Sequence, residues 1–278
     1  MFSPFDRSYA EVIGDPIAHS KSPLIHKFWL EKAGLEGDYR RARVRPDELA
    51  SYLETRRADP DWRGCSVTIP HKEAISSLLD ERRMWGVEAV NCVTPEQGRL
   101  IGRNTDVDGV GKALTGGVET WAPTCVIGAG GAARAAIAEL DIRAVYRFNL
   151  IARDSVKGRR VVERYEDDGR VFGFEAAEEA MRGCVGLINA SPLGMDGFEP
   201  MPEAILDSLP SLEPRAFVFD MVYAPVETQL LRRAAALGLT PIDGLTMLLG
   251  QAEEAFALFF GERPPAGHEP ELRELLTR

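Results

Sequence analysis

The chain has 278 residues, and its hydrophobic content of 45% is enough to build one large core or two ordinary ones. It carries 33 basic and 43 acidic residues, with a formal net charge of −10 and no block of Lys or Arg to follow a phosphate backbone, which argues against a nucleic-acid partner. No apolar run approaches the ~18 residues of a membrane-spanning helix, and Met1–Ala10 lacks the apolar core of a signal peptide. We therefore expect a cytoplasmic globular protein with no membrane partner.

The cysteines predict buried, reduced thiols. Cys65, Cys92, Cys125 and Cys184 lie far apart and form no CxxC pair, which is the usual picture in a reducing compartment. The four histidines also lack ligand spacing, so we expect no metal site.

In chain order, the first half alternates short apolar strands with helices. Pro23 suits the first turn of a helix that Gly34 closes, and Pro70 stops a β-branched run. A Gln97-Gly98 turn separates two paired strands. The expected strands are 9–14, 39–44, 64–69, 88–93 and 100–102, and the expected helices are 24–34, 46–57 and 72–79. Such alternation indicates an α/β layer.

A glycine-rich loop follows the apolar run 125–127 and opens an alanine-rich helix that reaches residue 140. Its residues are Gly128, Ala129, Gly130, Gly131, Ala132 and Ala133. This is the strand–turn–helix context of a dinucleotide fingerprint. Gly128 suits the tight turn, Gly130 lets the backbone approach a pyrophosphate, and the phosphate charge is favoured at the helix N-terminus. We predict that residues Gly128 to Ala132 bind a cofactor and that a complete domain precedes them.

The second half continues the alternation. A linking helix is expected at 106–115, strands at 145–152, 185–189, 216–221 and 239–242, and helices at 176–181, 228–237 and 245–260. The long last helix is apolar enough to pack back on the first domain. We therefore expect a two-domain α/β protein. Residues 1–105, completed by 238–278, form the substrate-binding and catalytic domain, and 106–237 form a Rossmann-type dinucleotide-binding domain.

Short motifs at the ends of these elements occur in a recognisable order. They are GDPIAHSKSP at 14–23, VTIPHK at 67–72, AVN at 89–91, NTD at 104–106, NASPLGM at 189–195, DMVY at 220–223 and DGL at 243–245. Together with the glycine loop, they resemble the shikimate dehydrogenase family over most of the chain. The resemblance implies reversible reduction of 3-dehydroshikimate to shikimate with NADPH, a step of chorismate and aromatic amino-acid biosynthesis.

The resemblance assigns catalysis to Lys72 and Asp106. Lys72 follows a strand and a proline, so it lies at a helix start. Hydride addition to a ketone leaves an alkoxide, which a positioned ammonium group protonates. Asp106 begins the linking helix, where it would complement the helix dipole. In the family this position forms a dyad with the lysine, in which the carboxylate orients the ammonium group.

Polar residues at element ends are the expected substrate ligands. Ser20 and Ser22 lie two residues apart before a helix, where hydroxyl and N–H groups hold a carboxylate; the alternative is that Ser22 merely caps the helix. The resemblance assigns the ring hydroxyls to Thr68, Asn91 and Gln251. A site that hydrogen-bonds several hydroxyls rejects analogues that lack them.

The resemblance extends to the cofactor side of the site. It places Tyr223 with the substrate ligands, and Met221 and Gly244 beside the nicotinamide. Arg153 and Lys157 follow the second strand of the cofactor domain, where NADP-dependent enzymes carry cations for the 2′-phosphate. These two residues favour NADP over NAD.

Three positions depart from the family pattern, and one of them is Cys92, where threonine is common in the family. Ser66 stands where the family usually has an asparagine that touches substrate; as a shorter ligand it loses this contact or makes it through water. Asp154 replaces a threonine, and a carboxylate there repels a phosphate, which keeps NAD as the alternative cofactor. Quinate or an aminated shikimate-like ring is the alternative substrate, and a non-catalytic ligand sensor is the remote alternative. The expected oligomeric state is a monomer or homodimer.

Overall fold

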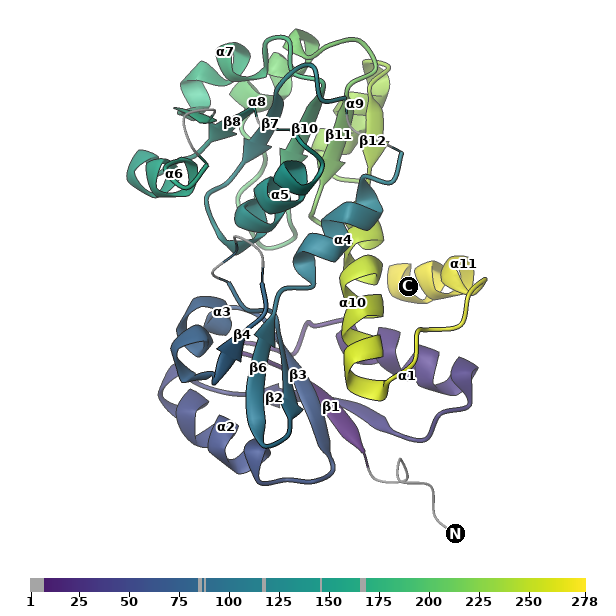
Figure 1. The fold of residues 1–278 in the computed structure, drawn as a ribbon. Coiled ribbons are helices and arrows are strands. Elements are labelled where there is room, and N and C mark those ends of the chain that lie inside the picture. The colour runs from purple at the N-terminus through teal and green to yellow at the C-terminus, as the bar shows by residue number, and fades with distance from the viewer. Residues whose placement is uncertain (1–7, 85–86, 88, 117–118, 146, 166–168) are drawn as a thin grey trace. The chain divides into compact units, whose positions relative to one another are not determined.

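The computed structural model describes residues 8–278 except 85–86, 88, 117–118, 146 and 166–168. The chain forms two compact units (Figure 1). Unit 1 comprises residues 1–105 and 251–278, and unit 2 comprises residues 106–250. The second boundary differs from the expected return at residue 238, because the strand at 240–242 pairs within the sheet of unit 2.

Unit 1 is built on a mixed sheet in the order β2-β1-β3-β5-β6-β4. Its strands are β1 (Tyr9–Gly14), β2 (Asp38–Arg43), β3 (Trp62–Val67), β4 (Glu81–Arg82), β5 (Cys92–Glu96) and β6 (Arg99–Arg103). β1 is parallel to both β2 and β3, whereas β5 is antiparallel to β3 and β6. The carboxyl ends of β1, β2 and β3 therefore lie at one edge of the sheet, where the loops that carry the predicted ligands begin.

Helices cover both faces of this sheet. They are α1 (Ser22–Ala33), α2 (Leu49–Arg57), α3 (His71–Ala74), the second half of α10 (Gly244–Phe260) and α11 (Glu269–Thr277), with short 3-10 turns η1 (Pro46–Glu48) and η2 (Ile75–Leu78). α1 ends at Gly34, whose φ of 63° is the left-handed conformation that glycine adopts without strain. The single helix expected at 72–79 is divided between α3 and η2.

The two faces of the unit 1 sheet bury different side chains. Against α2 lies an aliphatic core to which β1, β3 and β5 contribute, including Ile13, Leu53 and Val93. Against α1 and α10 lies an aromatic cluster made of His26, Trp29, Tyr39, Phe256, Phe259 and Phe260. Burying each large apolar side chain contributes about 1.5–3 kcal/mol, so these two layers hold the strands in register.

His26 is the polar member of the aromatic cluster. Its ring stacks on Tyr39 with the centroids 3.9 Å apart and the planes 1° from parallel. Burial lowers the pKa of His26 to about 3, and neither ring nitrogen has a hydrogen-bond partner among the described residues. His26 therefore packs as a neutral aromatic ring at any pH near neutrality.

Unit 2 is built on a sheet in which every pair of neighbouring strands is parallel, in the order β12-β11-β10-β7-β8-β9. Its strands are β7 (Thr124–Ile127), β8 (Phe148–Ile151), β9 (Gly169–Phe172), β10 (Gly186–Asn189), β11 (Phe217–Asp220) and β12 (Thr240–Ile242). Counted from β7, this is the spatial order 3-2-1-4-5-6 of a dinucleotide-binding fold. The order reverses between β7 and β10, which makes the ends of these strands the expected ligand site.

The helices of unit 2 lie on both faces of its sheet, and two buried clusters fill these layers. The helices are α4 (Asp106–Ala113), α5 (Gly131–Ile142), α6 (Ser155–Val162), α7 (Ala177–Met181), α8 (Glu203–Ser208), α9 (Gln229–Ala236) and the first turns of α10, with 3-10 turns η3 (Phe174–Ala176) and η4 (Leu209–Ser211). Every helix in the described part of the chain is too short or too polar to cross a membrane.

Several elements differ from the sequence-based expectation. Four elements were not predicted, namely β4, α6, α8 and β9. β4 has only two residues, and α6 is rich in charge and contains Gly158, so neither gives a clear pattern. The strand expected at 88–93 begins at Cys92, and Glu88 lies outside the described residues. The strand expected at 145–152 is the shorter β8, and residue 146 is likewise outside the described part.

The buried state of His26 predicts an acid-sensitive fold. The unfolded chain protonates this ring below about pH 6.5, whereas the folded protein resists protonation until about pH 3. The contribution of His26 to the free energy of unfolding is therefore fully present above pH 6.5. It is lost as the pH falls from 6.5 to 3, where the unfolding constant rises by up to ~10-fold per pH unit. Urea unfolding at pH 7 and pH 5 measures this effect. The free energy of unfolding of His26→Phe should rise relative to that of the wild type when the pH is lowered.

The control for this prediction is His268→Gln, which changes a partly exposed histidine. The difference in free energy of unfolding between His268→Gln and the wild type should change less between the two pH values than the difference between His26→Phe and the wild type. A stability difference between wild type and His26→Phe that is the same at both pH values would contradict the prediction.

Candidate active site

The loops after β1 and β3 are joined edge to edge. The Thr68 N–H donates to the Ile13 carbonyl at 3.0 Å, and the Asp15 N–H donates to the Ile69 carbonyl at 3.1 Å. A Cβ at Gly14 would lie 2.6 Å from Thr68 Cγ2 and 2.9 Å from the Ile69 oxygen, so only glycine fits there. The loop that carries the two serines therefore starts beside the loop that leads to Lys72.

Ser20 and Ser22 lie together at the start of α1. Their Oγ atoms are 3.3 Å apart, and the Ser22 N–H also donates to Ser20 Oγ at 3.3 Å. The Arg41 guanidinium donates to the Ser20 carbonyl and fixes this loop. Lys21, not Ser22, occupies the N-cap position, and no side chain caps the helix, so the capping alternative for Ser22 is wrong. Paired hydroxyls at a helix start suit a carboxylate.

Lys72 is the second residue of α3 and is half-buried. Its carbonyl accepts a hydrogen bond from the Val90 N–H at 2.8 Å. One residue earlier, His71 donates its N–H to the Thr68 carbonyl at 2.9 Å, and its buried ring contacts the Val44 carbonyl at 2.7 Å. The backbone at His71 and Lys72 is thus hydrogen-bonded both to the Thr68 loop and to the segment before β5.

Asn91 connects two segments that lead to predicted site residues, the end of β3 and residues 103–105. Its carbonyl accepts from the Val67 N–H at 2.7 Å, and its own N–H donates to the Arg103 carbonyl at 3.1 Å. Its side chain accepts from the Thr105 N–H at 2.6 Å and donates to Thr105 Oγ1 at 3.1 Å. Asp106 follows Thr105 directly, so this buried amide fixes the residue that leads to the predicted catalytic acid.

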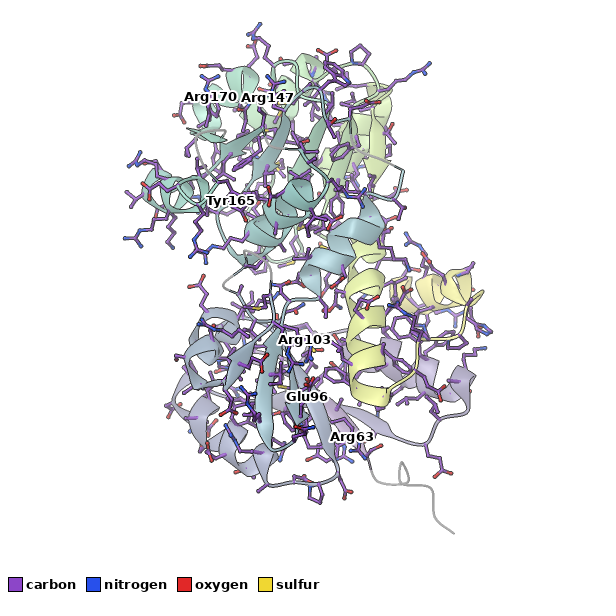
Figure 2. All side chains as sticks on the ribbon, viewed as in Figure 1. Arg63, Glu96, Arg103, Arg147, Tyr165 and Arg170 are labelled. Carbon is purple, nitrogen blue, oxygen red and sulfur yellow. The ribbon has the colours of Figure 1, made fainter. Side chains whose placement is uncertain are left out.

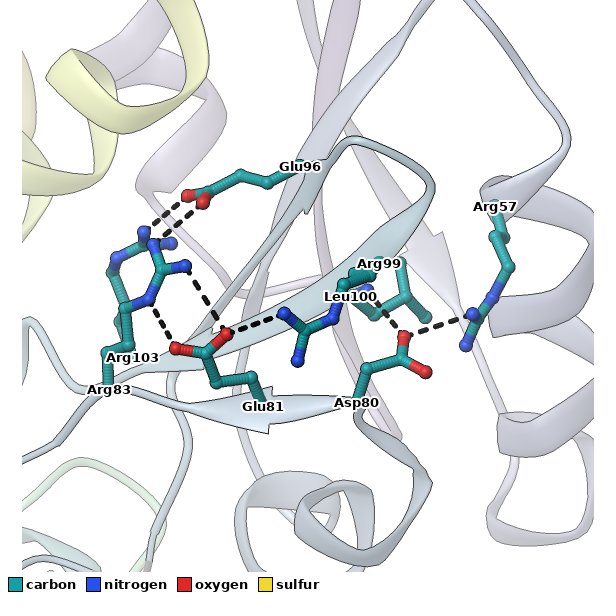
Figure 3. Close-up of polar contacts among 8 residues, drawn as sticks. All are labelled: Arg57, Asp80, Glu81, Arg83, Glu96, Arg99, Leu100 and Arg103. Carbon is teal, nitrogen blue, oxygen red and sulfur yellow. Dashed lines mark hydrogen bonds and ion pairs between the residues drawn. The ribbon is translucent and has the colours of Figure 1, made fainter.

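A charged network supports Arg103 on the surface of the sheet (Figures 2 and 3). Arg103 donates to Thr94 Oγ1 at 2.5 Å and forms an ion pair with Glu96. Glu96 also pairs with Arg83 at 2.7 Å, and Arg83 pairs with Glu81 at 2.7 Å. Hydrogen bonding to Arg103 holds the pKa of Glu96 below its usual value. Single exposed pairs contribute little, but this network ties β4 to β5 and β6 beside Arg103.

The remaining predicted ligands of unit 1 lie on the face that α1 and α10 cover. Ser66 is buried in β3 and accepts a hydrogen bond from the Tyr39 hydroxyl at 2.7 Å. Gln251 lies on α10 and is half-buried. Unit 1 therefore holds the following predicted site residues: Ser20, Ser22, Ser66, Thr68, Lys72, Asn91 and Gln251.

The other predicted site residues belong to unit 2. They are Asp106, Gly128, Ala129, Gly130, Gly131, Ala132, Arg153, Lys157, Met221, Tyr223 and Gly244. Asp106 is buried at the first position of α4.

The glycine loop lies where the strand order of unit 2 reverses. Gly128 has a φ of 115°, and a Cβ there would lie 2.9 Å from the Ala190 oxygen beyond β10. Apart from its chain neighbours, a Cβ at Gly130 would meet no atom of the described residues within 4 Å. Gly130 is the N-cap residue of α5, and no side chain of the residues that the structure describes caps this helix. Gly128 is thus required by the turn itself, whereas Gly130 and the helix start fit the approach of a pyrophosphate.

The segment after β8 carries both cations and a carboxylate. Asp154 caps α6, and its Oδ1 accepts from the N–H groups of Val156 at 2.9 Å and Lys157 at 3.0 Å. These bonds, with that from Lys157 foremost, lower the pKa of Asp154, so it is ionised at neutral pH. Arg153 forms an ion pair with Glu199, and both side chains are 65% exposed. Asp154 therefore caps the start of α6, and Glu199 is the ion-pair partner of Arg153.

A buried carboxylate organises the loop after β11, and sequence reasoning missed its role. Asp220 is fully buried; its Oδ1 accepts from Asn189 Nδ2 at 2.8 Å and the Val222 N–H at 3.0 Å, and its Oδ2 accepts from Thr228 Oγ1 at 2.7 Å. Burial raises the pKa of Asp220, and the three donors oppose this effect. Asp220 opens the DMVY motif, but nothing in that motif shows that its carboxylate is buried.

The same loop carries Met221 and Tyr223, both of which are partly buried. A Cβ at Gly244 would lie 2.6 Å from the Met221 oxygen and 2.5 Å from the Val222 oxygen. The structure therefore gives Gly244 a packing role against this loop, in addition to the predicted one beside the nicotinamide. Burial raises the pKa of Tyr223, so its hydroxyl stays protonated at neutral pH.

Among the described residues, no group of three or more His, Cys, Asp or Glu side chains is arranged to hold a metal ion. The four cysteines are all buried and free.

The strand order of unit 2 and its glycine loop define a Rossmann-type dinucleotide-binding protein. Two family models match the chain. The shikimate dehydrogenase substrate binding domain matches residues 12–93, and the shikimate 5′-dehydrogenase C-terminal domain matches residues 244–268. An NADP(+) shikimate dehydrogenase from Sphingopyxis alaskensis is 47% identical over 280 residues, and the match covers 100% of both chains.

Solved structures agree with these matches. Shikimate 5-dehydrogenase from Thermus thermophilus, in complex with NADP(H) and shikimate, has a TM-score of 0.80 at 34% identity, covering 98% of each chain. Quinate dehydrogenase from Corynebacterium glutamicum, in complex with NAD, has a TM-score of 0.85 at 27% identity, covering 98% of this chain and 99% of that one. The chain belongs to the shikimate dehydrogenase family.

The Asp220 network makes a prediction about stability. Asp220→Ala leaves three donors without their acceptor in a buried place, which should lower the free energy of unfolding by about 3 kcal/mol. Asp207→Ala removes an exposed carboxylate of the same unit and should cost less than ~0.5 kcal/mol. Urea unfolding measures both variants. Equal losses would contradict the organising role of Asp220.

Proposed function

We propose that the chain catalyses the reversible reduction of 3-dehydroshikimate to shikimate with NADPH, as an oxidoreductase of chorismate and aromatic amino-acid biosynthesis. The observation that carries the proposal is the arrangement around Asn91, which ties together the backbone of Lys72, the end of β3 and the residue before Asp106. Family membership supports the same reaction.

Unit 1 binds the substrate. The hydroxyls of Ser20 and Ser22 receive the carboxylate at the start of α1, where the helix dipole favours an anion. Thr68, Asn91 and Gln251 bind the ring hydroxyls. Since the polar groups of such a site are left unpaired by an analogue without these hydroxyls, the site selects a polyhydroxylated ring.

Lys72 moves the proton. During reduction its Nζ donates to the oxygen of the former ketone, and during oxidation it takes the proton back. Asp106 acts with Lys72 as a dyad and orients its ammonium group. The position of Asp106 directly after Thr105, whose amide is bonded to Asn91, supports this pairing.

Unit 2 holds the cofactor, which supplies the hydride when bound. The start of α5 receives the pyrophosphate, because no side chain caps it and Gly130 leaves its backbone accessible. Arg153 and Lys157 receive the 2′-phosphate of NADP, with the phosphate replacing Glu199 as the partner of Arg153. Met221 and Gly244 line the nicotinamide, with Tyr223 on the substrate side.

We place the protein in the cytoplasm, as a monomer or homodimer without a nucleic-acid partner. The four buried, unpaired cysteines support a reducing compartment.

An absorbance assay of the reduced cofactor tests the proposal. Purified protein receives shikimate or quinate, each with NADP+ or NAD+, and the highest kcat/KM is expected for shikimate with NADP+. Quinate enters the assay because Ser66 departs from the family pattern, and NAD+ because of Asp154. Preference for quinate or NAD+ would move the protein to the alternative within the family. Absence of turnover with all four pairs would leave a ligand-sensing module.

Removal of the proposed proton donor should stop turnover. Lys72→Ala is expected to lower kcat by at least ~100-fold, since the alkoxide then has no positioned acid. Lys27→Ala is the control, because Lys27 is an exposed lysine paired with Asp38. Steady-state kinetics at saturating substrate measure both variants. A Lys72→Ala variant with wild-type turnover would refute the mechanism.

Removal of the proposed phosphate ligand should change the cofactor preference. Arg153→Ala is expected to raise the KM for NADP+ about 10-fold and to leave the KM for NAD+ nearly unchanged, because only NADP carries the 2′-phosphate. Arg182→Ala removes a matched exposed Arg–Glu pair of unit 2 and should change neither value. Parallel rises for both cofactors would show that Arg153 does not recognise this phosphate.

A further inference from the structure

The Tyr39–Ser66 hydrogen bond is a buried polar contact on the substrate side of unit 1. Tyr39 lies in β2 with no exposed surface, and its hydroxyl donates to Ser66 Oγ at 2.7 Å. A phenol is a stronger hydrogen-bond donor than an alcohol, which favours this direction of the bond. Burial raises the pKa of Tyr39 well above its usual value, so the phenol carries its proton at every working pH.

The Tyr39 ring is held rigidly in place. On one face it stacks on the neutral His26 ring at 3.9 Å, and the Phe259 ring packs at 6.1 Å and 46°. A buried aromatic ring packed in this way does not swing to another partner. The position of the hydroxyl that meets Ser66 is therefore set by the aromatic cluster and not by the substrate.

Strand alternation places Ser66 on the same face as Thr68. Cys65 and Val67 belong to the aliphatic core against α2, so Ser66 points to the opposite face. The chain continues from Val67 into Thr68, two residues beyond Ser66, and this parity predicts that Thr68 shares its face. Ser66 thus precedes Thr68, a predicted ligand of the substrate ring, by two residues on the same face.

Helix α10 runs so that Gln251 lies towards the carboxyl edge of the same sheet. Phe260 packs against Gly37, before the amino end of β2, and Phe259 packs against Gly64 within β3. Residues earlier in α10 therefore lie progressively closer to the carboxyl edge of the sheet. Gln251 precedes Phe259 by eight residues, about 12 Å along a helix, and Thr68 follows Gly64 by four residues, about 13 Å along a strand. Ser66 consequently lies between the aromatic cluster and the polar end of the site.

We propose that Tyr39 is a substrate-positioning residue that acts through Ser66, an inference that rests on the proposed function. Ser66 carries a single hydroxyl proton. Because Tyr39 donates to its oxygen, that proton is directed away from Tyr39 and towards the substrate ring. The pair takes over the place of the longer asparagine that the family usually has at this position.

Steady-state kinetics of Tyr39→Phe test the proposal. The substitution removes one oxygen and keeps the stacked ring. The Ser66 proton then loses its fixed direction, and the KM for shikimate should rise about 3- to 10-fold. The kcat should change less than 2-fold and the KM for NADP+ should stay constant, because Lys72 and unit 2 are untouched.

Ser66→Ala and the double variant complete a cycle. Ser66→Ala should raise the KM for shikimate at least as much as Tyr39→Phe, and the double variant should equal Ser66→Ala, since Tyr39 has nothing left to act through. Tyr52→Phe is the matched control. Its hydroxyl donates to Glu11 on the α2 side of the same sheet, so it should leave the KM for shikimate unchanged. Thermal unfolding of each variant separates a loss of stability from a change in KM.

Three results would overturn the proposal. They are a Tyr39→Phe variant with wild-type KM, effects of the two single variants that multiply in the double variant, or a Ser66→Ala variant with wild-type KM. The last result decides the matter even if Tyr39→Phe does not fold. A wild-type protein without shikimate turnover would instead overturn the proposed function, and this inference with it.

Discussion

The substrate side of the protein depends on one buried amide, that of Asn91. Burying an amide costs free energy unless its polar atoms are hydrogen-bonded, and here the backbone and side chain of Asn91 are bonded to two separate segments, the end of β3 and residues 103–105. Those bonds fix the end of β3, the end of β6 and the Thr105 backbone relative to one another. The neighbouring Val90 N–H adds the carbonyl of Lys72 to the same cluster. The backbone of Lys72, the proposed proton donor, is thereby fixed before substrate arrives, which lowers the entropic cost of the proposed reaction.

Unit 2 uses a charged residue for a comparable purpose. Asp220 receives three hydrogen bonds in a fully buried place and thereby fixes the loop with Met221 and Tyr223. Elsewhere the backbone itself determines the geometry. Gly14 and Gly244 occur where a neighbouring backbone approaches too closely for a Cβ, and Gly128 adds a positive φ to such a contact. In both units, the predicted site residues lie in loops at strand ends or on the helices that follow them.

Local signals were enough to predict much of this organisation from the sequence. The glycine loop after an apolar strand, the helix closed by Gly34 and the position of Lys72 after Pro70 all depend on neighbouring residues. The contacts that join distant segments could not be predicted, because no periodicity links Asn91 to Thr105 or Tyr39 to Ser66. The charged α6 and the two-residue β4 give no hydrophobic pattern. The sequence also left a capping role for Ser22 open as an alternative, although the cap position belongs to Lys21. The roles of the predicted site residues remain predictions.

A crystal structure of the wild-type chain with shikimate bound would show whether the proposed site holds the substrate. We expect the shikimate carboxylate on the hydroxyls of Ser20 and Ser22, and Lys72 Nζ within hydrogen-bonding distance of the ring hydroxyl that becomes the ketone. A carboxylate bound elsewhere, with the lysine directed away from the ring, would contradict the proposed site.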